Sequence, residues 1–250
     1  MRFSANLGFL WADRPLPAAI HAAAEAGFDA VECHWPYNTP PESVRAALES
    51  TGLPMLGLNT IRGAAGENGL AALPGRESAA RAAIDEAIAY ADAVDARAIH
   101  VMAGFADGAE AHRVFLENLG YACGATPRTI LIEPLNRHDA PGYFLQTTDQ
   151  AMRVIHAVGA ANLKLMFDCY HVGRTEGDVL TRLETLLPSI GHIQFASVPD
   201  RGPPTESELN YDAIFRRIEE LGWPHPLGAE YRVIGATDES TEWLSRWQDA

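Results

Sequence analysis

The feature that most constrains the fold is an alternation of short apolar runs with longer, alanine-rich amphipathic runs. The apolar runs are expected to be strands, at Phe3–Leu10, Ala30–Trp35, Met55–Thr60, Ala98–Gly104, Thr129–Leu135, Leu163–Asp168, His192–Ser197 and Leu227–Tyr231. The amphipathic runs are expected to be helices, at Pro15–Ala26, Pro41–Ser50, Arg76–Ala93, Ala109–Ala122, Thr148–Val158, Gly177–Leu187, Tyr211–Leu221 and Glu239–Trp247. Strands separated by helices of this length predict βαβ units and a parallel sheet.

Eight such units in a chain of 250 residues are typical of a closed α/β barrel. An open doubly wound sheet is the alternative, but its first strand-to-helix turn often carries a glycine-rich loop, and here that turn reads LGFLWADRP. Gly27, Gly52, Gly159 and Gly222 follow expected helices, where left-handed caps are common. No Ser/Gly linker divides the chain. We therefore expect one domain, a single (β/α)8 TIM barrel over residues 1–250.

Charge and composition exclude some classes of partner. The chain has 19 Lys and Arg against 33 Asp and Glu, a net charge of −14, which argues against nucleic-acid binding. It does not exclude a small anionic substrate, because one arginine or a metal reverses the local field. No apolar run of about 18 residues or signal-like N-terminus is present, so no membrane association is expected. Three widely spaced cysteines indicate reduced thiols in a cytoplasmic protein.

Polar residues mark the ends of four consecutive expected strands. They are Glu133, Asp168, Gln194 and Glu230. Active sites of α/β barrels lie at the C-terminal ends of the strands. Because side chains alternate along a strand, these four are expected to face the barrel axis while neighbours such as Ile132 face the helices.

Three carboxylates on one axis raise each other's pKa strongly, and a divalent cation resolves that conflict. Three carboxylates and an amide oxygen form an all-oxygen set, which favours Mg²⁺ or Mn²⁺. Zn²⁺ is the alternative, although it more often brings histidine ligands. Each acidic residue taken singly is equally well a solvated loop residue. All four embedded in apolar runs favour a site, because an ionised group there needs a partner.

These residues and their flanks resemble the hydroxypyruvate isomerase family of xylose-isomerase-like barrels. The similarity covers nearly the whole chain, through RFSANL, GFDAVE, LPGRE, IEPLN, FDCYH, HIQ, PDRGPP, ELNY and GAEY in order. It implies a metal held by Glu133, Asp168, Gln194 and Glu230, with Glu133 and Glu230 as the catalytic acid/base pair. Related sugar 3-epimerases are expected to carry His where this chain has Gln194.

Two features of the resemblance bear on the substrate. LNTIRGAAGENGLAALPGRE and IHVMAG also resemble 2-oxo-tetronate isomerases, a sister group with a substrate one carbon longer, whereas IEPLNRHDAPGYF is more like hydroxypyruvate isomerase. Arg232 follows Tyr231 where the family commonly has Lys, and the two cations are not interchangeable at a tight site. The resemblance leaves both substrates open.

The implied reaction interconverts hydroxypyruvate and tartronate semialdehyde (2-hydroxy-3-oxopropanoate) through an enediolate. The metal acts as a Lewis acid toward the substrate oxygens. One glutamate takes the C3 proton and the other returns a proton at C2; which does which is left open. The partner is thus a small anionic hydroxy-oxo acid.

Four further residues near strand ends are predicted to contact the substrate. They are His171, Arg201, Asn59 and His100. His171 is suited to a hydrogen bond or proton shuttling, and Arg201 to pairing with the substrate carboxylate. The competing interpretation is that His171 is a structural loop residue and Arg201 an exposed one.

Other residues near the expected rim have two interpretations each. Glu32 either binds the substrate or braces His171. Trp11, Trp35 and Tyr37 either wall the pocket mouth or pack in the core. Cys169 is expected to point away from Asp168 and receives no chemical role.

Other classes of function remain open. A repair endonuclease shares this barrel superfamily and would use Asp168 and His171, but it should carry more histidine ligands and a basic rim. A sugar epimerase keeps the two-glutamate chemistry on neutral sugars. A catalytically silent barrel that acts as a binding protein has little reason to keep both Glu133 and Glu230. A homo-oligomer also remains open.

Overall fold

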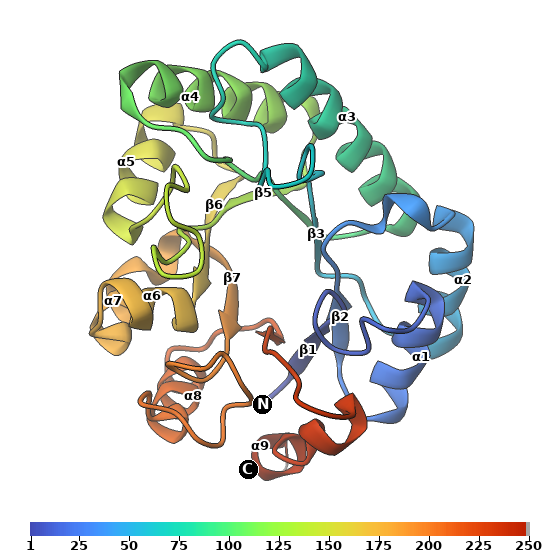
Figure 1. Cartoon of the computed structure of the whole chain (residues 1–250). Coiled ribbons are helices and arrows are strands. Elements are labelled where there is room, and N and C mark those ends of the chain that lie inside the picture. The colour runs from blue at the N-terminus through green and yellow to red at the C-terminus, as the bar shows by residue number, and fades with distance from the viewer. Residues whose placement is uncertain (249–250) are drawn as a thin grey trace.

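A computed structural model describes residues 1–248, which form an eight-stranded sheet. The strands are β1 (Phe3–Asn6), β2 (Ala30–Glu32), β3 (Gly57–Asn59), β4 (Ala98–His100), β5 (Thr129–Ile132), β6 (Leu163–Asp168), β7 (Ile190–Phe195) and β8 (Leu227–Ala229). All paired strands are parallel, in the order β2-β1-β8-β7-β6-β5-β4-β3. Figure 1 shows the strands at the centre with the helices around them. The predicted (β/α)8 barrel is confirmed.

Backbone hydrogen bonds join the two end strands of the sheet, β2 and β3. Val31 forms a parallel bridge with Met55. The Leu56 N–H donates to the Val31 carbonyl at 2.7 Å, and the Cys33 N–H donates to the Gly57 carbonyl at 3.1 Å. These bonds bring the ends of all eight strands around one axis, which places residues from distant parts of the chain on a common rim.

Seven of the eight expected helices are present. The helices of residues 1–248 are α1 (Leu16–Glu25), α2 (Pro41–Thr51), α3 (Glu77–Val94), α4 (Gly108–Ala125), α5 (Thr148–Val158), α6 (Cys169–Thr175), α7 (Val179–Leu186), α8 (Tyr211–Glu220) and α9 (Leu244–Gln248). None of the helices within residues 1–248 combines the length and the apolar character needed to cross a membrane.

Two expected elements differ at the ends of the chain. The strand expected over Phe3–Leu10 ends at Asn6, because the Asn6 Oδ1 accepts the Gly8 N–H at 2.9 Å and turns the chain. The helix expected over Glu239–Trp247 is instead a 3-10 turn at Thr237–Thr241 followed by α9.

Helix α6 was not expected, and it begins directly at the end of β6. Asp168 is its N-cap, and the Asp168 Oδ1 accepts the Tyr170 N–H at 2.8 Å. This bond satisfies one of the free N–H groups of the first turn. Asp168 is therefore fixed by the backbone at the point where the strand becomes a helix, with one oxygen left to face the barrel axis.

The alternation of side chains along β5 and β6 is as predicted. Ile132 and Phe167 belong to the large core cluster, while Leu131 and Met166 form a separate small cluster with Ala98. Leu131 and Met166 also line a small space that they share with residues of opposite strands. The small cluster is therefore the apolar floor of the barrel interior.

Candidate active site

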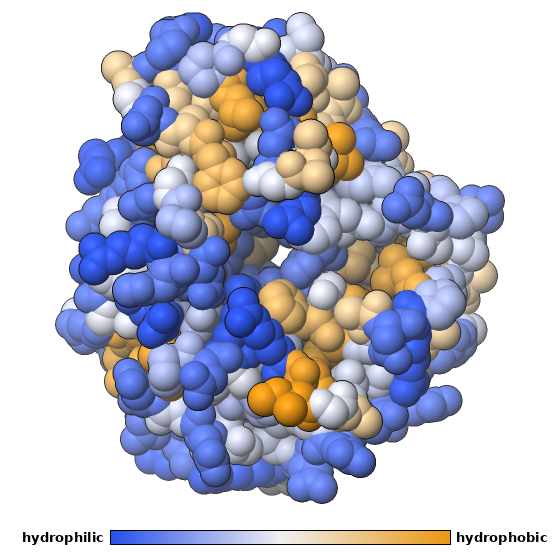
Figure 2. Space-filling view, in the orientation of Figure 1, coloured by the Kyte–Doolittle hydropathy of each residue, from blue (hydrophilic) through white to orange (hydrophobic). Residues whose placement is uncertain are grey.

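A cavity of about 390 Å³ opens at the C-terminal ends of the strands. Figure 2 shows the molecule hollowed at its centre, in the same orientation as the barrel of Figure 1. Six of the eight predicted site residues line this cavity: Asn59, His100, Glu133, His171, Arg201 and Glu230. The other two lie deeper, since Gln194 lines the small space below, and Asp168 pairs with Gln194 in the β6–β7 register and is 1% exposed.

Four oxygens at the ends of successive strands are buried without a hydrogen-bond partner in the described structure. They are Glu133 Oε1, Asp168 Oδ2, Gln194 Oε1 and Glu230 Oε2. Buried polar atoms normally have a hydrogen-bond partner, so we expect a ligand to contact these atoms. A set of carboxylate and amide oxygens is the chemistry that a hard divalent cation prefers. The residues present thus fit the expected metal.

The pKa values of two of these carboxylates, Glu133 and Asp168, are raised. Burial, followed by repulsion from Glu230 and Asp168, raises the pKa of Glu133 well above its ordinary value. Burial and the Glu230 charge raise the pKa of Asp168 to about 7. A bound cation favours the ionised forms of both groups and therefore opposes these shifts.

Glu230 follows β8 and has the opposite behaviour. Burial alone would raise its pKa, but the Arg201 charge and a hydrogen bond from His34 outweigh burial and lower the pKa to about 2. The His34 Nε2–H donates to Glu230 Oε1 at 2.8 Å, and Arg201 Nη2 lies 3.1 Å from Glu230 Oε2. Glu230 is thus held as a carboxylate by two neighbours, one at each of its oxygens.

His34 is a site residue that sequence reasoning missed. It follows β2 within the expected strand Ala30–Trp35, so its place at a strand end was the available signal. Its ring lies so close to Gly8 that a Cβ atom on Gly8 would come within 2.1 Å of His34 Nδ1. The missing side chain at Gly8 is therefore a condition for the contact between His34 and Glu230.

Arg201 is an interior cation, so the interpretation of an exposed loop arginine is wrong. It is 8% exposed. Its guanidinium carbon lies 4.7 Å from the centre of the Phe9 ring and 5.0 Å from that of Tyr170, distances typical of cation–π contacts. Arg201 Nη2 also lies 3.9 Å from Asp168 Oδ2. Its positive charge therefore sits among the carboxylates.

His171 combines with Glu133 and Asp168 in the one group of acidic, Cys and His side chains within residues 1–248 whose ligand atoms lie within 4.8 Å of one another. The backbone N–H of Asn136 donates to His171 Nδ1 at 3.0 Å, and Asn136 Nδ2 also donates to it at 2.8 Å. Burial, followed by the Arg201 charge, lowers the His171 pKa to about 3, so the ring is neutral at pH 7.

A neutral ring that accepts at Nδ1 carries its proton on Nε2. The His171 Nε2–H lies 3.6 Å from Asp168 Oδ2 and 3.8 Å from Glu133 Oε1. A protonated nitrogen cannot ligate a metal. The hydrogen bonds from Asn136 therefore favour His171 as a donor toward the cavity, and its contact with the substrate stays a prediction.

His100 is a second neutral imidazole on the cavity wall. It ends β4, is 2% exposed, and neither of its ring nitrogens has a hydrogen-bond partner among the described residues. Burial lowers its pKa to about 4. Its Nδ1 lies 3.7 Å from Glu133 Oε2. A buried imidazole in this state is free to bond an oxygen that enters the cavity.

One secondary expectation needs correction, and a choice between two interpretations is decided. Glu32 does not brace His171; its carboxylate instead contacts His192, Gln194 and Asn6. Of the three aromatic residues, Trp35 lines the cavity, while Trp11 bonds Asp238 and Tyr37 packs on Tyr90. Sequence proximity to a strand end did not distinguish these positions. Cys169 is buried in the core cluster, as expected.

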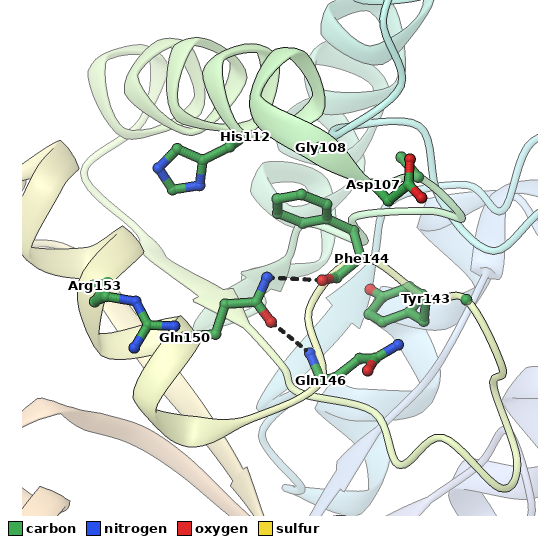
Figure 3. A pocket seen from close by; sticks show the side chains of 10 residues that line it. Asp107, Gly108, His112, Tyr143, Phe144, Gln146, Gln150 and Arg153 are labelled. Carbon is green, nitrogen blue, oxygen red and sulfur yellow. Dashed lines mark hydrogen bonds between the residues drawn. The ribbon is translucent and has the colours of Figure 1, made fainter.

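A larger cleft of about 710 Å³ lies beside the barrel, at the start of α4 and α5. Figure 3 shows its lining, where Gln150 bonds the backbone of Phe144 and Gln146. His112 and Arg153 point into the same cleft. No buried carboxylate lines it within residues 1–248. The converging acidic residues therefore assign the candidate active site to the smaller central cavity.

Comparisons with known proteins show the family of the chain. The family of xylose isomerase-like TIM barrels matches residues 20–247. The 2-oxo-tetronate isomerase of Cupriavidus necator is 43% identical over 252 residues, covering 97% of each chain. The hydroxypyruvate isomerase of Escherichia coli is 36% identical over 258 residues, covering 99% of this chain and 100% of that one.

A solved structure is also similar to this chain over nearly its whole length. The crystal structure of an AP endonuclease, family 2, from Brucella melitensis has a TM-score of 0.94 and 35% sequence identity, covering 98% of each chain. The chain therefore belongs to the xylose isomerase-like TIM barrel family, and it is an isomerase of the group that includes hydroxypyruvate isomerase and 2-oxo-tetronate isomerase.

Proposed function

We propose that this enzyme interconverts hydroxypyruvate and tartronate semialdehyde with a divalent metal. The observation that carries the proposal is the placement of Glu133 and Glu230, which reach one buried cavity from β5 and β8. Moving a proton between adjacent carbons needs one group that takes it and one that returns it. Two glutamates that line one small cavity supply that pair.

The metal would be held by Glu133, Asp168, Gln194 and Glu230, and Mg²⁺ or Mn²⁺ suits this oxygen set. When bound, it supplies Lewis-acid stabilisation of the negative charge that develops on the substrate oxygens. An oxygen without a hydrogen bond on each of the four residues supports this assignment. Glu230 would contribute from its position between His34 and Arg201.

The chain's own residues divide the remaining work. One glutamate takes the proton from C3, and the other returns a proton to C2 of the enediolate. The His171 Nε2–H donates to a substrate oxygen, and His100 and Asn59 contact the substrate from β4 and β3. Arg201 contributes positive charge toward the substrate and keeps Glu230 in place.

A second candidate substrate is a 2-oxo-tetronate. The Cupriavidus necator enzyme with that name is more similar to this chain than the Escherichia coli hydroxypyruvate isomerase, at 43% against 36% identity. A cavity of about 390 Å³ also leaves room for one further carbon. The same two glutamates would perform the same proton transfer on either acid.

The direct test is proton NMR of the metal-loaded enzyme in D₂O with hydroxypyruvate, a 2-oxo-tetronate and a neutral ketose in separate tubes. We expect tartronate semialdehyde to form from hydroxypyruvate, with deuterium from solvent in the product. Turnover of the 2-oxo-tetronate alone would assign the second candidate. Turnover of the ketose alone, or of none of the three, would contradict the proposed function.

Two exposed arginines at the cavity are expected to bind the anionic substrate. Arg62 and Arg232 both line the cavity, and the Arg62 guanidinium stacks on Trp35 at 4.8 Å. Arg62→Gln and Arg232→Gln are each expected to raise KM about tenfold, because a charge-assisted hydrogen bond contributes about 1.5 kcal/mol. We expect kcat to stay unchanged, since this binding is equal in ground and transition states. Steady-state kinetics on the acid measure both, and an unchanged KM in both variants would leave carboxylate recognition to Arg201.

A further inference from the structure

We propose that Glu32 is a positioning residue that sets the orientation of the Gln194 amide, so that its oxygen rather than its nitrogen faces the metal site. The inference rests on the proposed function in taking Gln194 as a metal ligand. A carboxylate presents equivalent oxygens whichever way it turns. An amide does not, and a reversed Gln would direct an NH₂ group at the cation. An amide ligand therefore needs a neighbour that fixes its direction.

The contact between Glu32 and Gln194 has the required polarity. Gln194 Nε2 donates to Glu32 Oε1 at 2.7 Å. Gln194 Oε1 is buried and has no hydrogen-bond partner in the described structure. A carboxylate only accepts hydrogen bonds, so the reversed amide would place two oxygens against each other. Glu32 thereby selects the orientation in which the amide oxygen is free for a ligand.

Two further side chains hold Glu32, one from β7 and one from β1. His192 Nε2 donates to Glu32 Oε2 at 2.7 Å, and Asn6 Nδ2 donates to Glu32 Oε1 at 3.0 Å. His192 stands two residues before Gln194 on β7, so both side chains leave the strand on the same face. Glu32 is 3% exposed. A carboxylate with donors on both oxygens has little freedom to turn away.

Gly228 provides the space in which this contact forms. It lies on β8 and is paired in register with Gln194 on β7. A Cβ atom at Gly228 would come within 2.7 Å of Glu32 Oε2 and 2.8 Å of Gln194 Cγ. The bare strand at this point lets the carboxylate from β2 reach the amide on β7. The space left by Gly228 is an observation, independent of the hydrogen bond, that supports the contact between Glu32 and Gln194.

The orienting role predicts a loss and a specific rescue. Glu32→Gln keeps the size of the side chain but lets either end of Gln194 bond to it. Losing such an orienting partner typically costs 10- to 100-fold in metal affinity, and we expect about that loss for Mn²⁺. Adding Gln194→Glu to Glu32→Gln is expected to restore Mn²⁺ affinity, because a carboxylate ligand cannot bind backwards. Gln194→Glu alone sets two carboxylates against each other, and we expect it to bind Mn²⁺ more weakly than the double variant.

The readout is the affinity of metal-stripped protein for Mn²⁺ without substrate. The electron paramagnetic resonance signal of free Mn²⁺ measures it. Thermal unfolding of each variant is measured in parallel, and Glu25→Gln, at an exposed position of α1, is the matched control. An unchanged affinity for Glu32→Gln would overturn the proposal. So would a loss that the double variant does not restore, since that pattern means a merely structural role.

The outcome is separable from that of the proposed function. Wild-type protein that binds Mn²⁺ but does not turn over hydroxypyruvate overturns the proposed reaction alone, and the affinities of the three variants still decide the role of Glu32. Wild-type protein that does not bind Mn²⁺ overturns the orienting role directly.

Discussion

Replacing Glu133 or Glu230 by Gln is expected to lower kcat for the isomerisation by about 10³-fold, because a positioned acid or base contributes about 10²- to 10⁴-fold. Gln keeps the shape of Glu but cannot take up or release the migrating proton. Both positions are buried in the cavity, so bulk water is a poor substitute. The measurement is proton NMR in D₂O, with Glu25→Gln as a control of equal charge change.

Deuterium exchange separates the two glutamates. The variant that lacks the base for C3 should neither form product nor exchange hydrogen. The variant that lacks the group returning the C2 proton should still form the enediolate, and it should return hydroxypyruvate labelled at C3. Wild-type kcat in either variant would contradict the assignment of that glutamate. Equal labelling in both variants would mean that neither glutamate is the C3 base.

Removal of the metal is the second change with a large expected effect. Metal-stripped enzyme should lose about 10²- to 10³-fold in turnover, the usual cost of losing a major electrostatic contact to the transition state. Mg²⁺ or Mn²⁺ should restore the activity. Each should also raise the melting temperature of the stripped protein, since a ligand that binds only the folded state stabilises it. Full turnover in the presence of a strong chelator would contradict the proposed metal.

Asp168→Asn tests the same point within the chain. Asn is a good N-cap, so the hydrogen bond to the Tyr170 N–H and the start of α6 should survive. The change removes one negative charge from the proposed ligand set. We expect weaker Mn²⁺ binding and lower kcat, with a nearly unchanged melting temperature without metal. A large fall in that melting temperature would mean that Asp168 acts mainly in the fold.

The parts of the fold that depend on local pattern could be predicted. Alternation along the apolar runs indicated that Ile132 faces the helices, and Glu133 lies in the cavity as expected. Helix α6 was missed because CYHVGRT has no amphipathic repeat and its start depends on the Asp168 cap. Strand β1 was predicted too long because the Asn6 turn interrupts an apolar run.

The contacts between site residues were harder to predict than the identity of those residues. His34 and Glu230 are 196 positions apart in the chain, and Glu32 and Gln194 are 162 apart. Only the strand order β2-β1-β8-β7 of the barrel brings these pairs within reach. A strand end indicates that a side chain reaches the rim. It does not indicate which other side chain it contacts at the rim.

The close approach of Gly8 to His34 has a consequence for directed evolution of this enzyme. Any side chain at position 8 overlaps the imidazole, so a library that randomises the first loop would mostly sample inactive clones. Arg62 borders the same cavity from the loop after β3, and its side chain is exposed. Enlarging the substrate range is therefore best begun from that side, with position 8 held as glycine.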